Sequence, residues 1–381
     1  MSIAIEPAGL SETQRQIVEL AREFARTRIE PFAAEWDRTA HFARDVIDAL
    51  GALGFLGMCT PEEYDGMGLD TVTYLLALEE IAAADASIAV SLSIHNAIPT
   101  TMLVRHGTAA QKERFLKRMA RGELLAGFAL SEPESGSDAA ALRTRAVRDG
   151  DRWVLSGAKA WATNGATADL MIVMARTERG ISAFIVPTDV PGYRPGKAEE
   201  KMGLRASNTV ALALEDVRLP ADCLLGEDGA GFGYAMEGLD AGRLGIAVQA
   251  VGIARRALEH AVAYCDERKQ FDRPLREFEA VQFKLADMAT RVEAARALAH
   301  VAGARRDRGE NVTTSASMAK LFASETAMWV TTQAVQLFGG YGYMRDFPVE
   351  KLFRDAKVTE IYEGTSEIQR ILVARGLYPR G

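Results

Sequence analysis

Residues 143–157 read RTRAVRDGDRWVLSG, and at this point the texture of the chain changes. Apolar and polar residues alternate on either side of Asp149 and Gly150, a pattern typical of two antiparallel strands joined by a tight turn. Short runs of the same kind, each bounded by glycine, proline or aspartate, follow at 169–177 (DLMIVMART), 181–189 (ISAFIVPTD) and 209–217 (TVALALEDV). The segment from Leu124 to about Pro220 therefore predicts a compact sheet or small barrel.

Helical patterns lie on both sides of this segment. Before it, residues 11–122 show the apolar spacing of helices, and an alanine-rich stretch from Tyr74 to about Ile94 predicts one buried helix. After it, long amphipathic helices with short links predict a bundle, at 244–268, 279–309 and 315–340. The predicted fold class is mostly α with a central β domain, and the predicted domains are residues 1–123, 124–232 and 233–381.

Size and composition are those of an ordinary globular protein. The chain has 381 residues, 48% hydrophobic and 25% charged, and a formal net charge of −7 from 45 Lys and Arg against 52 Asp and Glu. This acidic balance argues against a nucleic-acid-binding protein. No apolar run reaches about eighteen residues and no apolar signal segment opens the chain, so we expect a cytoplasmic protein without a membrane span. The scattered cysteines predict reduced thiols, at Cys59, Cys223 and Cys265.

Motifs of several other enzyme classes are missing from the sequence. It has no G-x-S-x-G elbow and no P-loop. The run GAGFG at 229–233 lacks the spacing of a dinucleotide loop, and we interpret it as a flexible lead-in to the helix near Leu239. The histidines show no metal-binding spacing, so no metal site is predicted from His41, His95, His106, His260 and His300.

Three polar or glycine-rich stretches are candidate ligand sites. The backbone amides of SEPESGSD (131–138) could bind carbonyl or phosphate oxygens, although a surface turn explains the stretch equally well. In AKAWATNGA (158–166), Trp161 and Thr163 could border a flat ring system or simply pack in a sheet. The glycines of QLFGGYGYMRDFPVEKLFRDA (336–356) allow close approach to a ligand and also suit a turn between helices.

The stretch IYEGTSEIQR (361–370) predicts a loop that leads into a helix. Ser366 and Gln369 have the spacing of a capping box, and the helix start offers unpaired N–H groups to an anionic ligand such as a pyrophosphate. Glu363 lies just ahead of that start. On its own, this carboxylate is most simply read as an acid that interacts with the helix dipole.

Six motifs, taken in order along the chain, closely resemble the acyl-CoA dehydrogenase family, especially its short-chain, butyryl-CoA dehydrogenase-like branch. They are SEPESGSD (131–138), KAWATNG (159–165), KMGLRASNT (201–209), ERKQF (267–271), QLFGGYGYMRDFPVEKLFRDA (336–356) and IYEGTSEIQR (361–370). GFLGMCTPEEYDGMGLD (54–70) and LDAGRLGIAVQAVGIA (239–254) extend the resemblance over nearly all of the chain. It implies an N-terminal helical domain, a small β-barrel or sheet domain and a C-terminal four-helix bundle.

The resemblance implies FAD-dependent α,β-dehydrogenation of a short-chain, possibly branched, acyl-CoA thioester to the trans-2-enoyl-CoA. Glu363 looks like the general base that removes the α-proton, while the hydride on Cβ passes to flavin N5. Such a proton is too weakly acidic for a free carboxylate, so the site must also stabilise the developing enolate. By resemblance, the protein donor to the thioester oxygen is the N–H of Glu363. An electron-transfer flavoprotein is the expected acceptor, and fatty acid β-oxidation the expected pathway.

Further roles are carried over from the same motifs. Residues expected to bind FAD are Phe128, Leu130, Ser131, Ser137, Trp161, Thr163, Arg268, Phe271, Gln336, Gly339, Gly340, Thr365 and Glu367. Those expected to contact the acyl-CoA are Ser137, Asp240, Arg243, Tyr362 and Gly364. The resemblance places Arg268, Phe271 and the segment 336–340 against the FAD of a neighbouring subunit. It therefore implies an oligomer, in this family usually a homotetramer.

Two positions depart from patterns within the family. Some branches carry their base one residue before the arginine of LDAGRL, where this chain has Gly242, and this strengthens Glu363 as the base. Glu279 stands where the family usually has glutamine, and an extra negative charge near the FAD phosphates is unfavourable.

Three functions are compatible with these features. The first is a dehydrogenase that passes electrons to an electron-transfer flavoprotein. The second is an oxidase on the same fold that reduces O₂, and oxygen reactivity would distinguish the two. The third is a non-catalytic acyl-CoA-binding protein, which an intact base and intact flavin motifs argue against.

Overall fold

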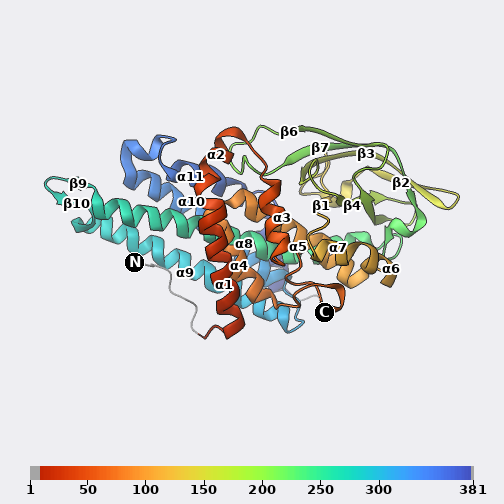
Figure 1. Ribbon diagram of the computed structural model, residues 1–381, viewed down its shortest axis with the longest axis horizontal. Coiled ribbons are helices and arrows are strands. Elements are labelled where there is room, and N and C mark those ends of the chain that lie inside the picture. The colour runs from red at the N-terminus through yellow and green to blue at the C-terminus, as the bar shows by residue number, and fades with distance from the viewer. Residues whose placement is uncertain (1–8, 379–381) are drawn as a thin grey trace.

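The computed structural model of the protein describes residues 9–378. Along the chain a helical part comes first, a sheet follows, and a second helical part comes last. In space the two helical parts pack together and the sheet lies beside them (Figure 1). This layout confirms the predicted fold class of a mostly α protein with a central β domain. The domain boundaries at 123/124 and 232/233 stay predictions. Residues 1–8 and 379–381 lie outside the described residues. They include the outer limits of the first and last predicted domains. They also include part of the N-terminal segment in which we predicted no apolar signal sequence.

The N-terminal part is built from helices that surround α4 and α5. Their bounds are α1 (Glu12–Phe24), α2 (Glu30–Thr39), α3 (Arg44–Ala52), α4 (Thr71–Ala84), α5 (Ala86–His106), α6 (Ala109–Gln111) and α7 (Lys117–Ala120). A π-helical turn, Ala25–Ile29, joins α1 to α2. The apolar side of α1 packs against α4, so the first helices close one side of the core.

The prediction of one helix from Tyr74 to Ile94 is wrong, because the chain breaks at Asp85. The buried Asp85 carboxylate accepts the N–H groups of Ser87 at 2.8 Å and Ile88 at 3.0 Å, and it thereby caps a new helix, α5. Helix α5 is long and apolar enough to cross a membrane by length and composition, but 89% of its most apolar window is buried within the fold. It is therefore a core helix of this fold.

The middle of the chain forms an eight-stranded sheet in the order β6-β7-β3-β2-β4-β5-β8, with β1 paired in parallel with β4. The strands are β1 (Ala126–Ala129), β2 (Arg145–Asp149), β3 (Arg152–Thr163), β4 (Leu170–Arg176), β5 (Ile181–Pro187), β6 (Tyr193–Ala198), β7 (Thr209–Pro220) and β8 (Leu224–Leu225). Gly150, at φ +60°, makes the turn between β2 and β3. The predicted hairpin and the three predicted β-runs are confirmed.

The C-terminal part is a bundle of long helices. Its elements are α8 (Gly231–Glu267), β9 (Lys269–Gln270), β10 (Arg273–Pro274), α9 (Glu279–Asp307), α10 (Thr313–Phe338), α11 (Pro348–Val358) and α12 (Ser366–Leu377). The predicted flexible lead-in up to Leu239 is wrong, because α8 already begins within the GAGFG run. A Cβ at Gly231 would lie 2.5 Å from the backbone nitrogen of Ala183, so glycine lets the helix start directly against β5.

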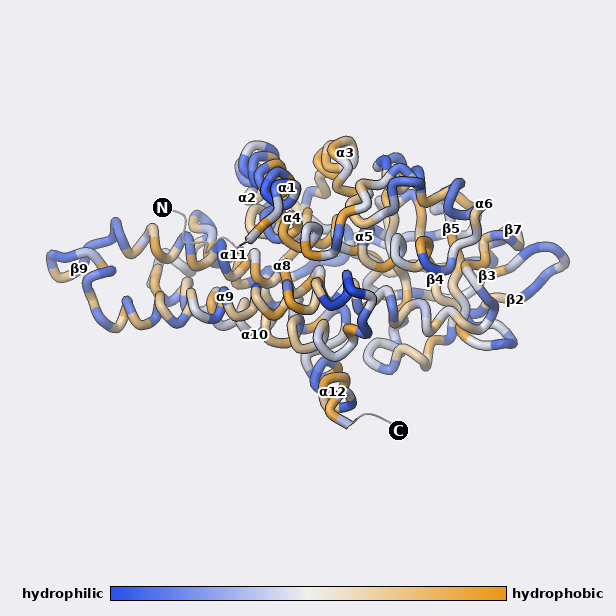
Figure 2. Tube along the Cα trace, turned by 90° about the horizontal axis from the view of Figure 1, so that it is seen from below, coloured by the Kyte–Doolittle hydropathy of each residue, from blue (hydrophilic) through white to orange (hydrophobic). Residues whose placement is uncertain are grey.

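Helix α8 connects the two helical parts, because it packs against α4 and α5 of the N-terminal part and against α9 and α10 of the C-terminal part. Hydrophobic residues follow the inner helices, while hydrophilic residues cover α1 and the β9 hairpin (Figure 2). In both views the sheet lies at one end of the long axis and the β9–β10 hairpin at the other.

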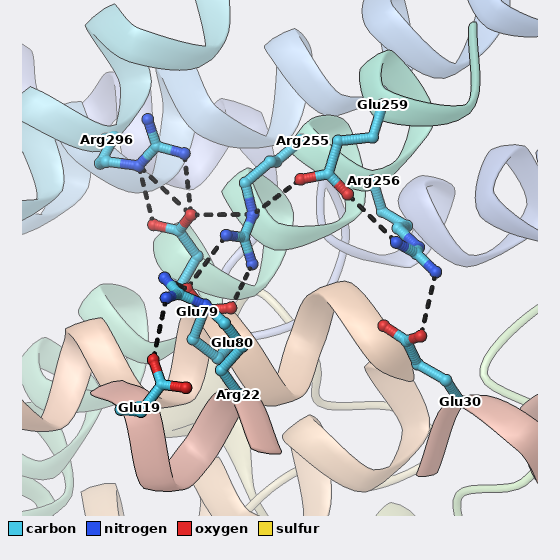
Figure 3. Close-up of polar contacts among 9 residues, drawn as sticks. All are labelled: Glu19, Arg22, Glu30, Glu79, Glu80, Arg255, Arg256, Glu259 and Arg296. Atoms are coloured by element: carbon cyan, nitrogen blue, oxygen red, sulfur yellow. Dashed lines mark hydrogen bonds and ion pairs between the residues drawn. The ribbon is translucent and has the colours of Figure 1, made fainter. Parts of the chain in front are cut away.

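A buried ionic cluster joins α1, α4, α8 and α9 (Figure 3). Arg296 holds the carboxylate of Glu79 at 2.8 Å, and Arg255 reaches the same carboxylate at 3.3 Å. Arg255 also binds Glu80 at 2.9 Å, which in turn accepts from Arg22 at 3.2 Å. Glu79, Arg255 and Arg296 are buried but mutually compensated, while Arg22 is half-exposed at the edge of the cluster. The ion pairs therefore fix how the helices pack against one another.

Candidate active site

The loop between α11 and α12 contains two successive residues in the left-handed backbone region. Glu363 has φ +54° and Gly364 has φ +90°. For a residue with a side chain this conformation costs about 1 kcal/mol, so the surrounding structure must hold it. Gln369 does so in part, because its Nε2 donates to the carbonyl oxygens of Glu363 at 3.1 Å and Gly364 at 2.9 Å.

The predicted capping box at Ser366 and Gln369 is wrong by one residue. The N-cap of α12 is Thr365, whose hydroxyl accepts the N–H of Ile368 at 3.4 Å. The hydroxyl of Ser366 is buried and has no partner among the described residues. Since the side chain of Gln369 binds the carbonyls of the preceding loop, it cannot also complete the box.

The carboxylate of Glu363 lies against Gly242 of α8. A Cβ built on Gly242 would lie only 2.8 Å from Oε2 and 3.1 Å from Cδ of Glu363. Glycine at this position therefore makes room for the carboxylate. Oε2 is buried and accepts no hydrogen bond from any described residue. A buried carboxylate oxygen without a donor is costly, and this arrangement suits proton transfer better than structural support.

Burial raises the pKa of Glu363 to about 7, and the positive charges of Arg243 and Lys320 lower it only in part. The carboxyl group therefore titrates near neutral pH, where a general base is most useful.

The residues predicted to contact the acyl-CoA gather around this loop, apart from Ser137. The guanidinium of Arg243 is buried and ion-paired with Asp240 on the same helix, and Asp240 also accepts the hydroxyl of Thr313 at 2.6 Å. Tyr362 donates its hydroxyl to the buried amide oxygen of Gln249 at 2.6 Å. The site thus combines one paired cation with an unpaired carboxylate.

A cavity of about 280 Å³ is lined by Ala241 of α8, the residue that precedes Gly242. Tyr74 of α4 and Asn96 and Thr100 of α5 also line it. The cavity therefore shares helix α8 with the Glu363 environment.

A second group of predicted residues lies on β1 and β3 of the sheet. Phe128 and Leu130 are largely buried, and Ser131 accepts the backbone N–H of Ala160 at 2.9 Å. Trp161 is 66% exposed and has φ +60°, so its ring stands out from the sheet rather than packing within it. The structure places Thr163 two residues further on β3, half-buried, and Ser137 in the exposed loop that follows Ser131.

The loop that carries Ser131 rests on a buried ion pair that the sequence analysis missed. Lys159 of β3 donates to the carboxylate of Glu132 at 2.7 Å and to the carbonyl of Leu130 at 3.1 Å. Glu132 also accepts the backbone N–H groups of Arg143 at 2.6 Å and Thr144 at 2.9 Å. These contacts fix the loop against the sheet.

A third group lies at the far end of the molecule. Arg268, Gly339 and Gly340 line a cavity of about 520 Å³ together with Gln270 of β9. The β9–β10 hairpin lies at the end of the molecule that is opposite the sheet (Figure 1). Phe271 is 88% exposed on that hairpin, and Gln336 is exposed near the end of α10. Within one chain these residues do not meet Trp161 of β3, because the long axis separates the hairpin from the sheet.

The residues on these surfaces fit a large planar cofactor with an anionic arm. Trp161 and Phe271 offer exposed aromatic faces, and the positions of Gly339 and Gly340 face open space, with nothing within 4 Å of an added Cβ. Arg268 supplies a cation beside them and stacks over Tyr341 at 5.5 Å. Glu279, which departs from the family pattern, is exposed at the first residue of α9, and Glu367 is exposed in the first turn of α12.

Lys320 contacts the loop of the candidate base, and the sequence analysis did not identify it. It lies on α10, is fully buried, and donates to the carbonyl of Gly364 at 2.7 Å. One signal was present in the sequence. A lysine on the face of α10 that otherwise carries Ala316, Ala319 and Ala323 is out of place in a core helix.

Comparisons with known proteins agree over nearly the whole chain. Residues 11–123, 127–217 and 229–378 match the domains described as acyl-CoA dehydrogenase N-terminal, middle and C-terminal domain, respectively. The chain is 47% identical over 370 residues to the mitochondrial short-chain specific acyl-CoA dehydrogenase of Bos taurus, which covers 96% of this chain and 90% of that protein.

Solved structures give the same result. The structure of butyryl-CoA dehydrogenase from Megasphaera elsdenii superposes with a TM-score of 0.96 at 42% identity, over 98% of this chain and 100% of that one. A chain in a structure described as the electron transferring flavoprotein of Acidaminococcus fermentans, studied for flavin-based electron bifurcation, superposes with a TM-score of 0.97 at 45% identity, over 98% and 100%.

Proposed function

Since this chain belongs to the acyl-CoA dehydrogenase family, whose members are FAD-dependent oxidoreductases, we propose that it oxidises the Cα–Cβ bond of a short-chain acyl-CoA, with Glu363 as the base. The observation that carries the proposal is the Glu363 carboxylate. It is buried against Gly242 with one oxygen free of hydrogen bonds from the described residues, and burial raises its pKa to about 7.

The reaction requires a proton to leave the α-carbon of a thioester. An ordinary carboxylate is a weak base in water, but a buried one binds a proton more tightly, because burial disfavours its charged form. Glu363 has this property and remains partly ionised near neutral pH. It can therefore accept the α-proton on the oxygen that no described residue engages.

The developing enolate oxygen needs a hydrogen-bond donor. Among residues 9–378, no backbone or side-chain acceptor receives the N–H of Glu363. The left-handed turn at Glu363 and Gly364 leaves this N–H free, and we assign it to the thioester carbonyl oxygen. The same residue then supplies both the base and one donor to the oxyanion.

When bound, FAD supplies the acceptor for the β-hydride at its N5 atom. In this proposal the flavin side of the site is formed by Phe128, Leu130, Ser131, Ser137, Trp161 and Thr163. Thr365 and Glu367, at the start of α12, serve the adenosine–pyrophosphate half. A second set of residues lies at the end of the molecule opposite the sheet, so we expect this set to bind the cofactor of a neighbouring subunit. These residues are Arg268, Phe271, Gln336, Gly339 and Gly340. The proposal therefore includes a homo-oligomer, and we expect a homotetramer.

The acyl-CoA itself is held by residues around the base loop. Arg243 and Asp240 present a buried ion pair to the polar part of the thioester, and Tyr362 and Gly364 flank the base. Ser137 completes the set from the sheet side. Orientation of the acyl chain between base and cofactor is expected to supply much of the rate.

The short-chain substrate and the electron acceptor rest on similarity to named relatives. The bovine relative is described as short-chain specific, and the Megasphaera structure is a butyryl-CoA dehydrogenase. The Acidaminococcus structure is described by an electron transferring flavoprotein, which supports such a flavoprotein as the acceptor here. Whether the preferred acyl group is straight or branched is decided by the titration described next.

An anaerobic titration with a panel of saturated acyl-CoAs tests the proposal. We expect a short straight or branched acyl-CoA to bleach the flavin absorbance stoichiometrically. A yellow protein that no saturated thioester reduces would overturn the substrate class. Rapid reoxidation of the reduced protein by O₂ alone would favour an oxidase, and a protein that does not take up FAD would favour a non-catalytic acyl-CoA binder.

A further inference from the structure

We propose that Lys320 is a positioning residue for this reaction, which holds the Glu363–Gly364 turn in place and, together with Arg243, supplies positive charge that stabilises the ionised Glu363 carboxylate. The inference rests on the proposed role of Glu363 as the base. Lys320 acts through Glu363 and is not proposed to touch substrate or cofactor.

The placement of Lys320 is unusual for a lysine. Its side chain is fully buried on α10, among alanines, and its Nζ lies 2.7 Å from the carbonyl oxygen of Gly364. Burying an ammonium group is costly unless charges or hydrogen bonds compensate it. Lysines elsewhere in the core have such partners. Lys159 is paired with Glu132, and Lys351 with Asp85 and Asp355.

Lys320, in contrast, forms no ion pair with any carboxylate of residues 9–378, and its hydrogen bond goes to the backbone of the base loop. The carbonyl of Gly364 accepts from Lys320 on one side and from Gln369 on the other. These two donors fix the left-handed turn at Glu363 and Gly364. This backbone conformation directs the Glu363 carboxylate towards Gly242 and leaves the Glu363 N–H without an acceptor among the described residues.

The charges that face Lys320 come from three elements. From α8 comes Arg243, which is already paired with Asp240. From the loop come Glu363 and Glu360, and from α12 comes Glu367.

Of these acids, Glu360 is paired with Lys357 at 2.6 Å, and Glu367 is exposed to solvent. Glu363 is therefore the buried, unpaired carboxylate within reach of the Lys320 charge. Burial keeps water from screening that charge fully, so it favours the ionised form of Glu363.

The titration of the two groups fits this reading. Burial lowers the pKa of Lys320 to about 8, while the negative charge of Glu363 acts to raise it. Burial raises the pKa of Glu363 to about 7, against the positive charges of Arg243 and Lys320. Each group thus supports the charged form of the other in the neutral pH range, and the pair titrates as a coupled system. An uncharged side chain would fill the same volume without this effect.

The test compares Lys320→Met, which removes the charge, with Lys320→Arg, which keeps it. The pH dependence of flavin reduction is measured anaerobically with the acyl-CoA that reduces the wild-type protein. We expect the rising limb of the Lys320→Met profile to move up by about one pH unit, with a roughly fivefold loss of rate at pH 7 and recovery to within a few-fold at high pH. Lys320→Arg should keep the wild-type limb.

A matched control removes one positive charge elsewhere. Lys197→Met lies on the exposed β6 and is expected to leave the limb in place, since solvent screens its charge. A 3-thia acyl-CoA gives a readout without turnover, because its sulfur acidifies the α-proton and its β-position carries no hydride. The pH at which its long-wavelength absorbance appears should shift by the same amount in Lys320→Met.

An unshifted limb in Lys320→Met would overturn the proposal, whether the rate is unchanged or reduced equally at every pH. Lys320→Gln, which keeps a donor and lacks the charge, carries the same test if the methionine variant does not accumulate. Failure of the proposed function is distinct, because no acyl-CoA would then reduce the wild-type flavin.

Discussion

Two glutamates in the helical parts of this protein have buried carboxylate oxygens in opposite surroundings. Glu79 lies on α4 at the centre of the ionic cluster, where Arg296 and Arg255 meet its carboxylate (Figure 3). Glu363 lies in a loop, where one oxygen faces Gly242 and accepts no hydrogen bond from the described residues. The side chains are identical, so the difference comes from what each one contacts.

The difference shows in how the two carboxyls bind protons. Burial acts to raise the pKa of Glu79, but the charges of Arg296 and Arg255 outweigh it and lower the pKa. Burial also raises the pKa of Glu363, and there the more distant charges of Arg243 and Lys320 do not cancel it. Glu79 is thus locked in its charged form as part of the scaffold, whereas Glu363 can gain and lose a proton near neutral pH.

The two carboxyls also affect stability with opposite signs. Because folding lowers the pKa of Glu79, its contribution is present above its unfolded pKa and is lost as the pH falls through the lowered folded value. Because folding raises the pKa of Glu363, the folded state binds more protons than the unfolded state between about pH 4.5 and 7, and stability falls as the pH rises through that window. Glu79 therefore stabilises the fold at neutral pH, whereas Glu363 costs stability there.

The largest expected effect is on activity, from Glu363→Gln. The amide keeps the shape of the side chain but cannot accept the α-proton, so flavin reduction by acyl-CoA should fall by about 10³- to 10⁴-fold. FAD binding should persist, and stability at pH 8 should equal or exceed that of the wild type, because no buried charge is formed. Reduction at more than a tenth of the wild-type rate would exclude Glu363 as the base.

The next largest effect is on stability, from Glu79→Gln. The change leaves Arg296 and Arg255 buried with their shared partner neutralised, and should cost about 3–5 kcal/mol of unfolding free energy in denaturant titration. The rate of flavin reduction per folded holoenzyme should stay within about twofold of the wild type.

Glu12→Gln is the matched control for Glu79→Gln, since it breaks an ion pair with Arg15 whose side chains are mostly exposed. It should change the unfolding free energy by less than about 0.5 kcal/mol. Equal losses in the two variants would contradict the structural role given to the buried cluster.

A smaller effect is expected from Gly242→Ala, which tests the geometry at the base. The new methyl group would lie 2.8 Å from Oε2 of Glu363, so the carboxylate must move. The displacement of the carboxylate should slow flavin reduction by about 10- to 100-fold, with little change in FAD affinity. Gly233→Ala on the same helix, where nothing lies within 4 Å of the new Cβ, should stay within about twofold. Similar rates in both variants would show that Gly242 does not make room for the base.

The sequence was sufficient for the order of elements but not for their limits. Period-two runs with turn residues correctly predicted β2, β3, β4, β5 and β7, because each strand is defined by local alternation. The limits at Asp85 and Gly231 were missed because tertiary contacts decide them. Asp85 caps a buried helix, and Gly231 lets α8 begin against β5.

The candidate site was predictable only as far as motifs reach. Glu363 was found through its sequence neighbours, whereas its contact with Gly242 and the support from Lys320 join residues far apart in the chain. The cap at Thr365 was misplaced because Thr365 and Ser366 can both cap a helix, and the backbone conformation decides between them. The contacts of Glu363 with Gly242 and of Gly364 with Lys320 depend on how distant segments pack, so they cannot be predicted from one stretch of sequence.

The most direct test of the central claim is the pH dependence of flavin reduction in a single turnover of the wild-type protein. The claim is that burial without a close partner makes Glu363 a base that titrates near neutral pH. We predict a rate that is half-maximal near pH 7, about tenfold lower at pH 6 than on the high-pH plateau, and a residual Glu363→Gln rate that lacks this limb. A wild-type rate that is constant from pH 5 to pH 9 would contradict the account.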